Sequence, residues 1–207
     1  WGKMKMYDSI IFDMDGTLVN FIDEMVIAWN DIFKKHGWNK VVTYDEVKKV
    51  MGMQCKEIGA LYFPCETEKE ATKRAETAFL EEIPYLEKMS CKTYIPNEQF
   101  LIDLSKKYKL FIVSNCLNGY IEMFLKKFNF GKYFVDFIDS STGKSKGQNI
   151  KDIVNKHQLE KPVYVGDTVK DYYSSLEAGI DFIFASYGFG KVDCKEKILD
   201  LTELLKY

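Results

Sequence analysis

Two carboxylates one residue apart, Asp13 and Asp15, directly follow a short apolar run in this 207-residue chain. The run, residues 7–12, is typical of a strand that is buried on both faces of a parallel sheet. Open sheets of this kind bind ligands beyond the carboxyl ends of their strands, which is where both acids would lie. Burying carboxylates there costs free energy unless a cation or hydrogen bonds compensate. We therefore interpret Asp13 and Asp15 as residues that do chemistry.

Two further apolar runs end in polar residues. Ser114 and Asn115 follow residues 110–113, and Asp167 comes two residues after the run 163–165. The carboxyl ends of parallel strands meet at one edge of a sheet, so we expect these side chains to gather around Asp13. Carboxylate oxygens suit a hard cation such as Mg²⁺. Hydroxyl and amide groups, together with free backbone N–H groups, can hold the oxygens of a phosphate.

A lysine can reach the same edge from residues 143–147, which precede a predicted helix. Lys146 opens that helix, and its ammonium group would neutralise charge on a phosphoryl group. Lys144 lies two residues earlier, and the spacing alone leaves both lysines open. Asp171, at the start of another predicted helix, is either a charge favoured by the helix dipole or a further member of the site.

The elements that must position these residues alternate between strand and helix from residue 96 onward. Apolar periodicity predicts helices over 96–107, 120–128, 146–157, 171–178 and 194–205, and strands over 110–113, 133–138, 163–165 and 182–185. This alternation predicts an α/β fold with a doubly wound, Rossmann-like parallel sheet and right-handed crossovers.

Residues 20–89 carry helical periodicity and no strand pattern. Helices are predicted over 21–36, from a capping box at residues 43–46 to about residue 51, and from 67 to about 84. We therefore expect an all-α cap domain at residues 20–89, inserted into a core domain formed by residues 1–19 and 90–207. The crossings near residues 18–20 and 90–94 would act as hinges.

The turn after the second cap helix contains Gly52, which permits a sharp backbone bend. Two interpretations of this turn stay open. It is either an ordinary connection between helices, or a specificity loop in which Met53 or Gln54 touches the substrate.

Together, these motifs resemble those of the haloacid dehalogenase-like superfamily. Residues 13–18, Asp-Met-Asp-Gly-Thr-Leu, match its DxDGTL signature. Ser114-Asn115, Lys146 and residues 166–171 are similar to its second, third and fourth motifs, in the family's order and at fitting separations. The resemblance covers essentially the whole chain. A helical cap between the first and second motifs resembles the phosphoglycolate phosphatase and β-phosphoglucomutase branch.

The resemblance implies a magnesium-dependent phosphatase that acts on a small phosphorylated metabolite. Asp13 would be the nucleophile that forms an aspartyl phosphate, and Asp15 would be the general acid and base. Mg²⁺ would be held by Asp13, the backbone carbonyl of Asp15 and Asp167, with Asp171 ligating the ion or supporting the site from behind. Three residues would bind the phosphoryl group: Ser114, Asn115 and Lys146.

Other functions compete with this one. A phosphomutase of the β-phosphoglucomutase type would use the same motifs. A phosphorylatable signalling module also combines acids, magnesium and a lysine, but about 120 residues suffice for it and it needs no inserted helices. A dehalogenase is disfavoured, because attack on carbon needs neither a second acid at position 15 nor a metal held by Asp167.

Composition excludes further classes. With 29 basic and 31 acidic residues the net charge is −2, so we expect neither a nucleic-acid nor a membrane partner. No apolar run approaches the roughly 20 residues that a membrane helix needs. Five scattered cysteines without a CxxC pair predict free thiols in a reducing compartment, hence a cytoplasmic protein, and we expect a monomer. Residues 1–3, ahead of two methionines at positions 4 and 6, are interpreted as non-native.

Overall fold

The computed structural model describes residues 7–207, so the interpretation of residues 1–3 lies outside the described part of the chain. Its centre is a six-stranded sheet in the order β5-β4-β1-β6-β7-β8, in which every pair of neighbours is parallel. The strands are β1 (Ser9–Phe12), β4 (Lys109–Val113), β5 (Phe134–Ile138), β6 (Pro162–Gly166), β7 (Asp181–Ala185) and β8 (Lys197–Ile198). The predicted α/β class is confirmed.

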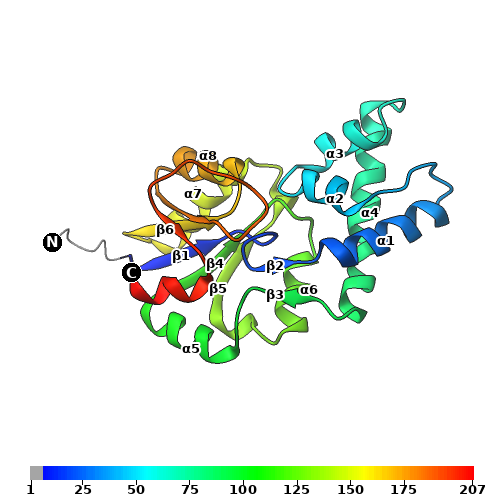
Figure 1. The fold of residues 1–207 in the computed structure, drawn as a ribbon. Coiled ribbons are helices and arrows are strands. Elements are labelled where there is room, and N and C mark those ends of the chain that lie inside the picture. Colours follow the sequence, from blue (N-terminus) through cyan, green and yellow to red (C-terminus); the bar gives the residue numbers. More distant parts are fainter. Residues whose placement is uncertain (1–6) are drawn as a thin grey trace.

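Helices cover both faces of this sheet (Figure 1). One face carries α7 (Lys146–His157) and α8 (Val169–Ala178), and the other carries α5 (Glu98–Lys107), α6 (Tyr120–Lys127) and the 3₁₀ helix η3 (Leu201–Lys206). Successive strand residues point to opposite faces. In β1, Ile11 joins the apolar cluster under α7, whereas Ile10 and Phe12 join the cluster on the other face. Strand β1 is therefore buried on both faces, and its carboxyl end lies between those of β4 and β6.

Four helices form the predicted all-α insertion and lie beyond the carboxyl ends of the strands (Figure 1). They are α1 (Ile22–Lys35), α2 (Tyr44–Val50), α3 (Cys55–Tyr62) and α4 (Glu68–Lys88). Edge-to-face contacts of Trp29 with Tyr62 and Phe79 join α1, α3 and α4. Both chain crossings to these helices are strands, β2 (Val19–Asn20) and β3 (Lys92–Thr93), which pair antiparallel. Periodicity did not predict this short ribbon or α3.

The prediction that the last helix of the insertion ends near residue 84 is wrong, because α4 continues through Pro84 to Lys88. Proline usually ends or kinks a helix. Here Leu86, beyond the proline, is fully buried on the same face as the preceding turns. Lys127 Nζ also donates to the carbonyls of Leu86 and Met89 at the end of the helix. Tertiary contacts therefore outweigh the local cost of the proline.

The prediction of a terminal helix over residues 194–205 is also wrong. Residues 197–198 form β8 instead, and the 3₁₀ helix η3 follows. The open edge of β7 explains the difference, since Phe184 N–H donates to Glu196 O and Ser186 N–H to Ile198 O. Two smaller 3₁₀ helices, η1 (Gly131–Tyr133) and η2 (Ser140–Thr142), flank β5. No helix within residues 7–207 has both the length and the apolar character required to cross a membrane.

Candidate active site

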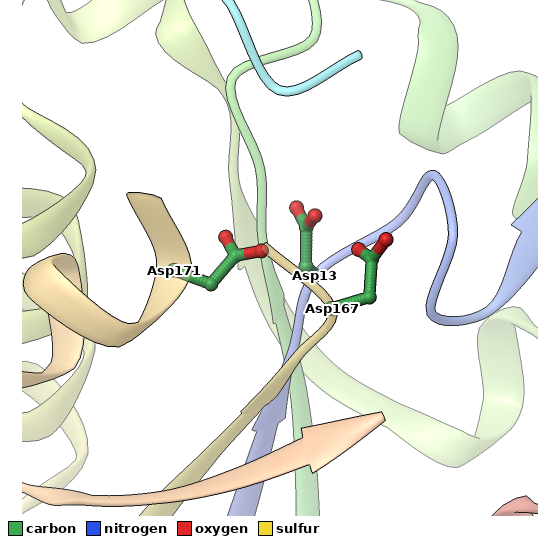
Figure 2. Close-up of side chains that lie close together, drawn as sticks. All are labelled: Asp13, Asp167 and Asp171. Atoms are coloured by element: carbon green, nitrogen blue, oxygen red, sulfur yellow. The ribbon is translucent and has the colours of Figure 1, made fainter. Parts of the chain in front are cut away.

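Three buried carboxylates meet at the carboxyl edge of the sheet: Asp13, Asp167 and Asp171 (Figure 2). Each offers an oxygen that lies within 4.8 Å of the oxygens of the other two. Asp13 follows β1, Asp167 follows β6, and Asp171 lies in the first turn of α8. Because β1 and β6 are neighbours, Asp13 N–H still donates to Val165 O at 2.9 Å. The parallel pairing thus brings together residues more than 150 positions apart.

Lys146 supplies a positive charge to this cluster. Its Nζ lies 2.9 Å from Asp13 Oδ1 and 2.7 Å from Asp171 Oδ1, and all three side chains are buried. Burial disfavours the ammonium, but Asp13 and Asp171 outweigh it and raise the pKa of Lys146 well above its ordinary value. Lys144 instead pairs with Asp152 at the surface. Of the two candidate lysines, the structure therefore brings Lys146 to Asp13.

Backbone and hydroxyl donors position the other two carboxylates. Phe189 N–H donates to Asp167 Oδ2 at 2.7 Å, and Thr17 Oγ1 donates to Asp167 Oδ1 at 3.3 Å. Asp171 Oδ2 accepts from the N–H and the hydroxyl of Thr168, in a capping box that opens α8. Asp171 therefore caps its helix and also contacts Lys146. The two interpretations of this residue, helix charge and site member, are compatible.

Gly16 allows the first motif to approach Asp167. It has a φ of +83°, and a Cβ at this position would lie 2.2 Å from Asp167 Oδ2. A side chain here would therefore meet both an unfavourable backbone conformation and a steric clash. Glycine after Asp15 is therefore required where the turn after β1 packs against Asp167.

Asp15 points to a different partner from that of Asp13. Its Oδ1 accepts a 2.7 Å hydrogen bond from the Tyr120 hydroxyl at the start of α6. Burial raises the pKa of Asp15 to about 7, the Tyr120 hydrogen bond opposes this shift, and the Asp13 charge adds to it. A carboxyl group with this pKa can both give and accept a proton near neutral pH.

A cavity opens above the two acids of the first motif. Ser114 and Asn115 line it from the core, and Gly52 lines it from the turn between α2 and α3. Asn115 Nδ2 donates to Gly52 O at 3.1 Å, so core and insertion meet at the cavity. Gly52 has a φ of +74°, as the predicted bend requires. Gln54 is exposed, begins α3 and does not line the cavity.

The acidic cluster has the composition of a divalent-cation site. Three carboxylates face one ammonium, so negative charge is in excess. Burial, followed by repulsion from Asp171, raises the pKa of both Asp13 and Asp167. A divalent cation would offset that repulsion. A donor set of oxygen atoms alone suits Mg²⁺ rather than a softer metal.

Sequence reasoning missed several residues of the site. Tyr120 and the 187–190 loop, which provides Phe189 N–H, each follow a strand end, the signal used for the other motifs. Glu82 of α4 is fully buried, and its Oε2 accepts from Trp29 Nε1. It lies in the buried stripe of α4, formed by Ala71, Ala75, Ala78, Glu82 and Leu86. That 3.6-residue period was the available signal for Glu82.

Comparison with known proteins agrees with this geometry. The family profile "Haloacid dehalogenase-like hydrolase" matches residues 10–185. The chain therefore belongs to the haloacid dehalogenase-like hydrolases. A search of curated proteins found no significant match.

Solved structures share the fold at low sequence identity. A haloacid dehalogenase-like family hydrolase from Streptococcus pneumoniae is 22% identical, with a TM-score of 0.82 and 99% of each chain covered. A predicted phosphatase from Clostridium acetobutylicum is 19% identical, with a TM-score of 0.80 and 98% of each chain covered. A predicted phosphoglycolate phosphatase from Haemophilus somnus 129pt is also 19% identical, with a TM-score of 0.82 and 98% of each chain covered.

Proposed function

We propose that this protein is a magnesium-dependent phosphatase that hydrolyses a small phosphomonoester through an aspartyl phosphate on Asp13. One observation carries the proposal. A buried carboxylate held by Lys146 and a second carboxyl with a pKa of about 7 line the same cavity. The first suits a nucleophile and the second suits a group that must act as acid and then as base. The similar structures that are named as predicted phosphatases support this assignment.

The reaction would proceed in two steps. In the first step, a carboxylate oxygen of Asp13 bonds to phosphorus, the ester P–O bond breaks, and Asp15 gives its proton to the leaving oxygen. In the second step, Asp15 takes a proton from water, which attacks phosphorus and releases phosphate from Asp13. Ser114 and Asn115 hold phosphoryl oxygens at the cavity wall, and Lys146 keeps Asp13 oriented and compensates its charge.

The cation would be held by Asp13, the backbone carbonyl of Asp15 and Asp167. When bound, Mg²⁺ would neutralise charge on the phosphoryl group. For Asp171 we propose a positioning role, because its two oxygens already accept hydrogen bonds from Lys146 and Thr168.

The insertion would act as a cap. We propose that residues 20–89 form a domain that moves against residues 1–19 and 90–207 about the β2–β3 ribbon, in a monomeric cytoplasmic enzyme. The Asn115–Gly52 hydrogen bond supports a closed arrangement in which the turn after α2 covers the site. Gln54, exposed outside the cavity, has no role in this proposal.

The test measures inorganic phosphate released from an aryl phosphate and from a panel of sugar, nucleotide and short-acid phosphates, with and without Mg²⁺. We expect release that requires Mg²⁺ and falls about 10⁴-fold or more in Asp13→Asn, because the nucleophile is lost. Asp152→Asn, which changes an exposed acid away from the site, is the control and should retain activity.

Other outcomes would contradict the proposal. If Asp13→Asn turned over substrate as fast as the native protein, Asp13 could not be the nucleophile. Phosphate transfer that depends on a sugar bisphosphate would indicate a mutase. A stable phosphorylated Asp13 without turnover would indicate a signalling module.

A further inference from the structure

The cavity above Asp13 and Asp15 has two chemically different ends. The end formed by the core carries the acids, Ser114 and Asn115. The rest of the wall is largely apolar and comes mainly from the cap helices and the turn between them: Val50, Met51, Met53, Cys55, Phe79 and Leu117. If the phosphoryl group binds at Asp13, the leaving group must lie against this apolar wall.

Within residues 7–207, no lysine or arginine lines that wall. Among the described residues that line the cavity, Asp13 and Asp15 are the only charged side chains. Lys146 is 4% exposed and is held between Asp13 and Asp171. Lys170, on α8, is paired with both carboxylate oxygens of Glu57 on α3, at 2.7 and 2.8 Å. A second anionic group on the substrate would therefore find no lysine or arginine in the cavity to pair with.

Glu82 lies near this wall and adds no positive charge to it. It is on α4, three residues after Phe79, and is fully buried. Its Oε1 has no hydrogen-bond partner in the described structure. Burial raises the pKa of Glu82 well above its ordinary value and so favours the neutral acid. An anionic group on the substrate would find no charge here to pair with.

We propose that the substrate is a monophosphate ester whose leaving group is small, uncharged and largely apolar. This inference rests on the proposed function, which places the phosphoryl group at Asp13. Burying an unpaired charge against apolar side chains carries a large free-energy cost, whereas an apolar group gains by leaving water. Phosphoglycolate carries a carboxylate beside its phosphate, so it is the wrong class of ester for this cavity. The chain would then differ from the neighbour named as a phosphoglycolate phosphatase.

The test compares esters that are matched in size but differ in charge. The pairs are phenyl phosphate with 4-carboxyphenyl phosphate, and ethyl phosphate with phosphoglycolate. We expect kcat/KM to be about 100-fold higher for the neutral member of each pair, because the anionic member would leave a charge unpaired. Dissociation constants of the same esters for Asp13→Asn, measured by calorimetry in Mg²⁺, should show the same order.

A cation placed on the apolar wall should reverse the preference. Met53→Lys introduces an ammonium on the turn above the site, and should raise the kcat/KM of the anionic members relative to the neutral ones by about 10-fold or more. Leu80→Lys is the matched control. Leu80 follows Phe79 on α4 but is 52% exposed, so a lysine there should leave the preference unchanged.

The outcomes separate the two proposals. Phosphate release with equal or greater kcat/KM for the anionic esters would overturn this inference and leave the phosphatase assignment intact. Release from none of the esters would contradict the phosphatase assignment. The calorimetric comparison would then decide the leaving-group class independently, and tighter binding of the anionic esters would overturn it.

Discussion

Two regions of this molecule bury carboxyl groups, and they do so in opposite ways. At the sheet edge, three aspartates share Lys146 and accept hydrogen bonds from Thr17, Thr168 and Phe189. On α4, Glu82 accepts one hydrogen bond from Trp29, and its other oxygen has no hydrogen-bond partner among the described residues. Both regions exclude water equally well, yet only the first provides compensating positive charge.

The difference shows what each site is suited to. At the sheet edge, Lys146 opposes the rise in pKa that burial causes at Asp13 and Asp167, and Phe189 N–H also opposes it at Asp167. Such compensation favours the ionised form, which the proposed nucleophile and metal ligands need. Without compensation, burial favours the neutral acid, and the pKa of Glu82 is accordingly raised well above its ordinary value. Burial of a carboxyl group therefore does not by itself identify a catalytic residue, because the neighbouring charges and hydrogen-bond donors set its protonation state.

Removing the positive charge should break the first region. In Lys146→Met, we expect a loss of about 3–5 kcal/mol in the free energy of unfolding without Mg²⁺, because buried carboxylates lose their partner. Urea denaturation measures this loss, which Mg²⁺ should reduce. Lys144→Met removes only an exposed pair and should change stability by less than about 0.5 kcal/mol. Equal effects of the two substitutions would contradict the assignment of Lys146.

Neutralising the acid in the cap should have the opposite effect, and one that depends on pH. Between the ordinary pKa of a glutamate and the raised pKa of Glu82, the folded state holds a proton that the unfolded state releases. Stability therefore falls as pH rises, by about 1.4 kcal/mol per pH unit. Glu82→Gln removes this dependence, so its stability relative to the native protein should increase as pH rises above the ordinary pKa of a glutamate. Urea denaturation at several pH values measures this increase.

The neighbouring residue provides the control for that experiment. Glu81 pairs at the surface with Lys35 and His36, and these hydrogen bonds lower its pKa. It is therefore ionised in both the folded and the unfolded state above pH 5. Glu81→Gln should show no comparable gain as pH rises. A flat stability difference between Glu82→Gln and the native protein would show that Glu82 is already ionised in the folded state.

The smallest expected effect concerns the Tyr120 hydroxyl, which donates a hydrogen bond to Asp15. In the proposed reaction the first step needs protonated Asp15, so the rate of phosphoryl transfer should fall as pH rises through about 7. The Tyr120 hydrogen bond stabilises the carboxylate. In Tyr120→Phe the pKa of Asp15 should therefore rise. The pH at which the rate falls should then be higher by about one unit.

A second tyrosine tests whether the effect is local. Tyr133→Phe removes a hydroxyl that donates to Glu98, a carboxylate outside the cavity, and should leave the profile unchanged. A downward shift in Tyr120→Phe would contradict the assigned direction of this hydrogen bond.

Much of the fold could be predicted because its signals are local. Buried strands, caps and alternation along the chain identified β1, β4, β6 and β7 and the helices between them. The predictions fail where contacts with residues distant in sequence determine the local structure. α4 passes Pro84 because Leu86 is buried beyond it, and residues 197–198 form a strand because β7 has an open edge. Neither partner is near in sequence.

The sequence by itself determined the class of fold and the meeting of Asp13 with Asp167, since parallel strands bring their carboxyl ends to one edge whatever surrounds them. Only the tertiary structure decided between Lys146 and Lys144 and brought Asp171 into contact with Lys146. It also paired Tyr120 with Asp15 and left one oxygen of the buried Glu82 without a hydrogen-bond partner among the described residues. These outcomes depend on the distances and dielectric surroundings of groups far apart along the chain. Packing sets both, and no local pattern encodes them.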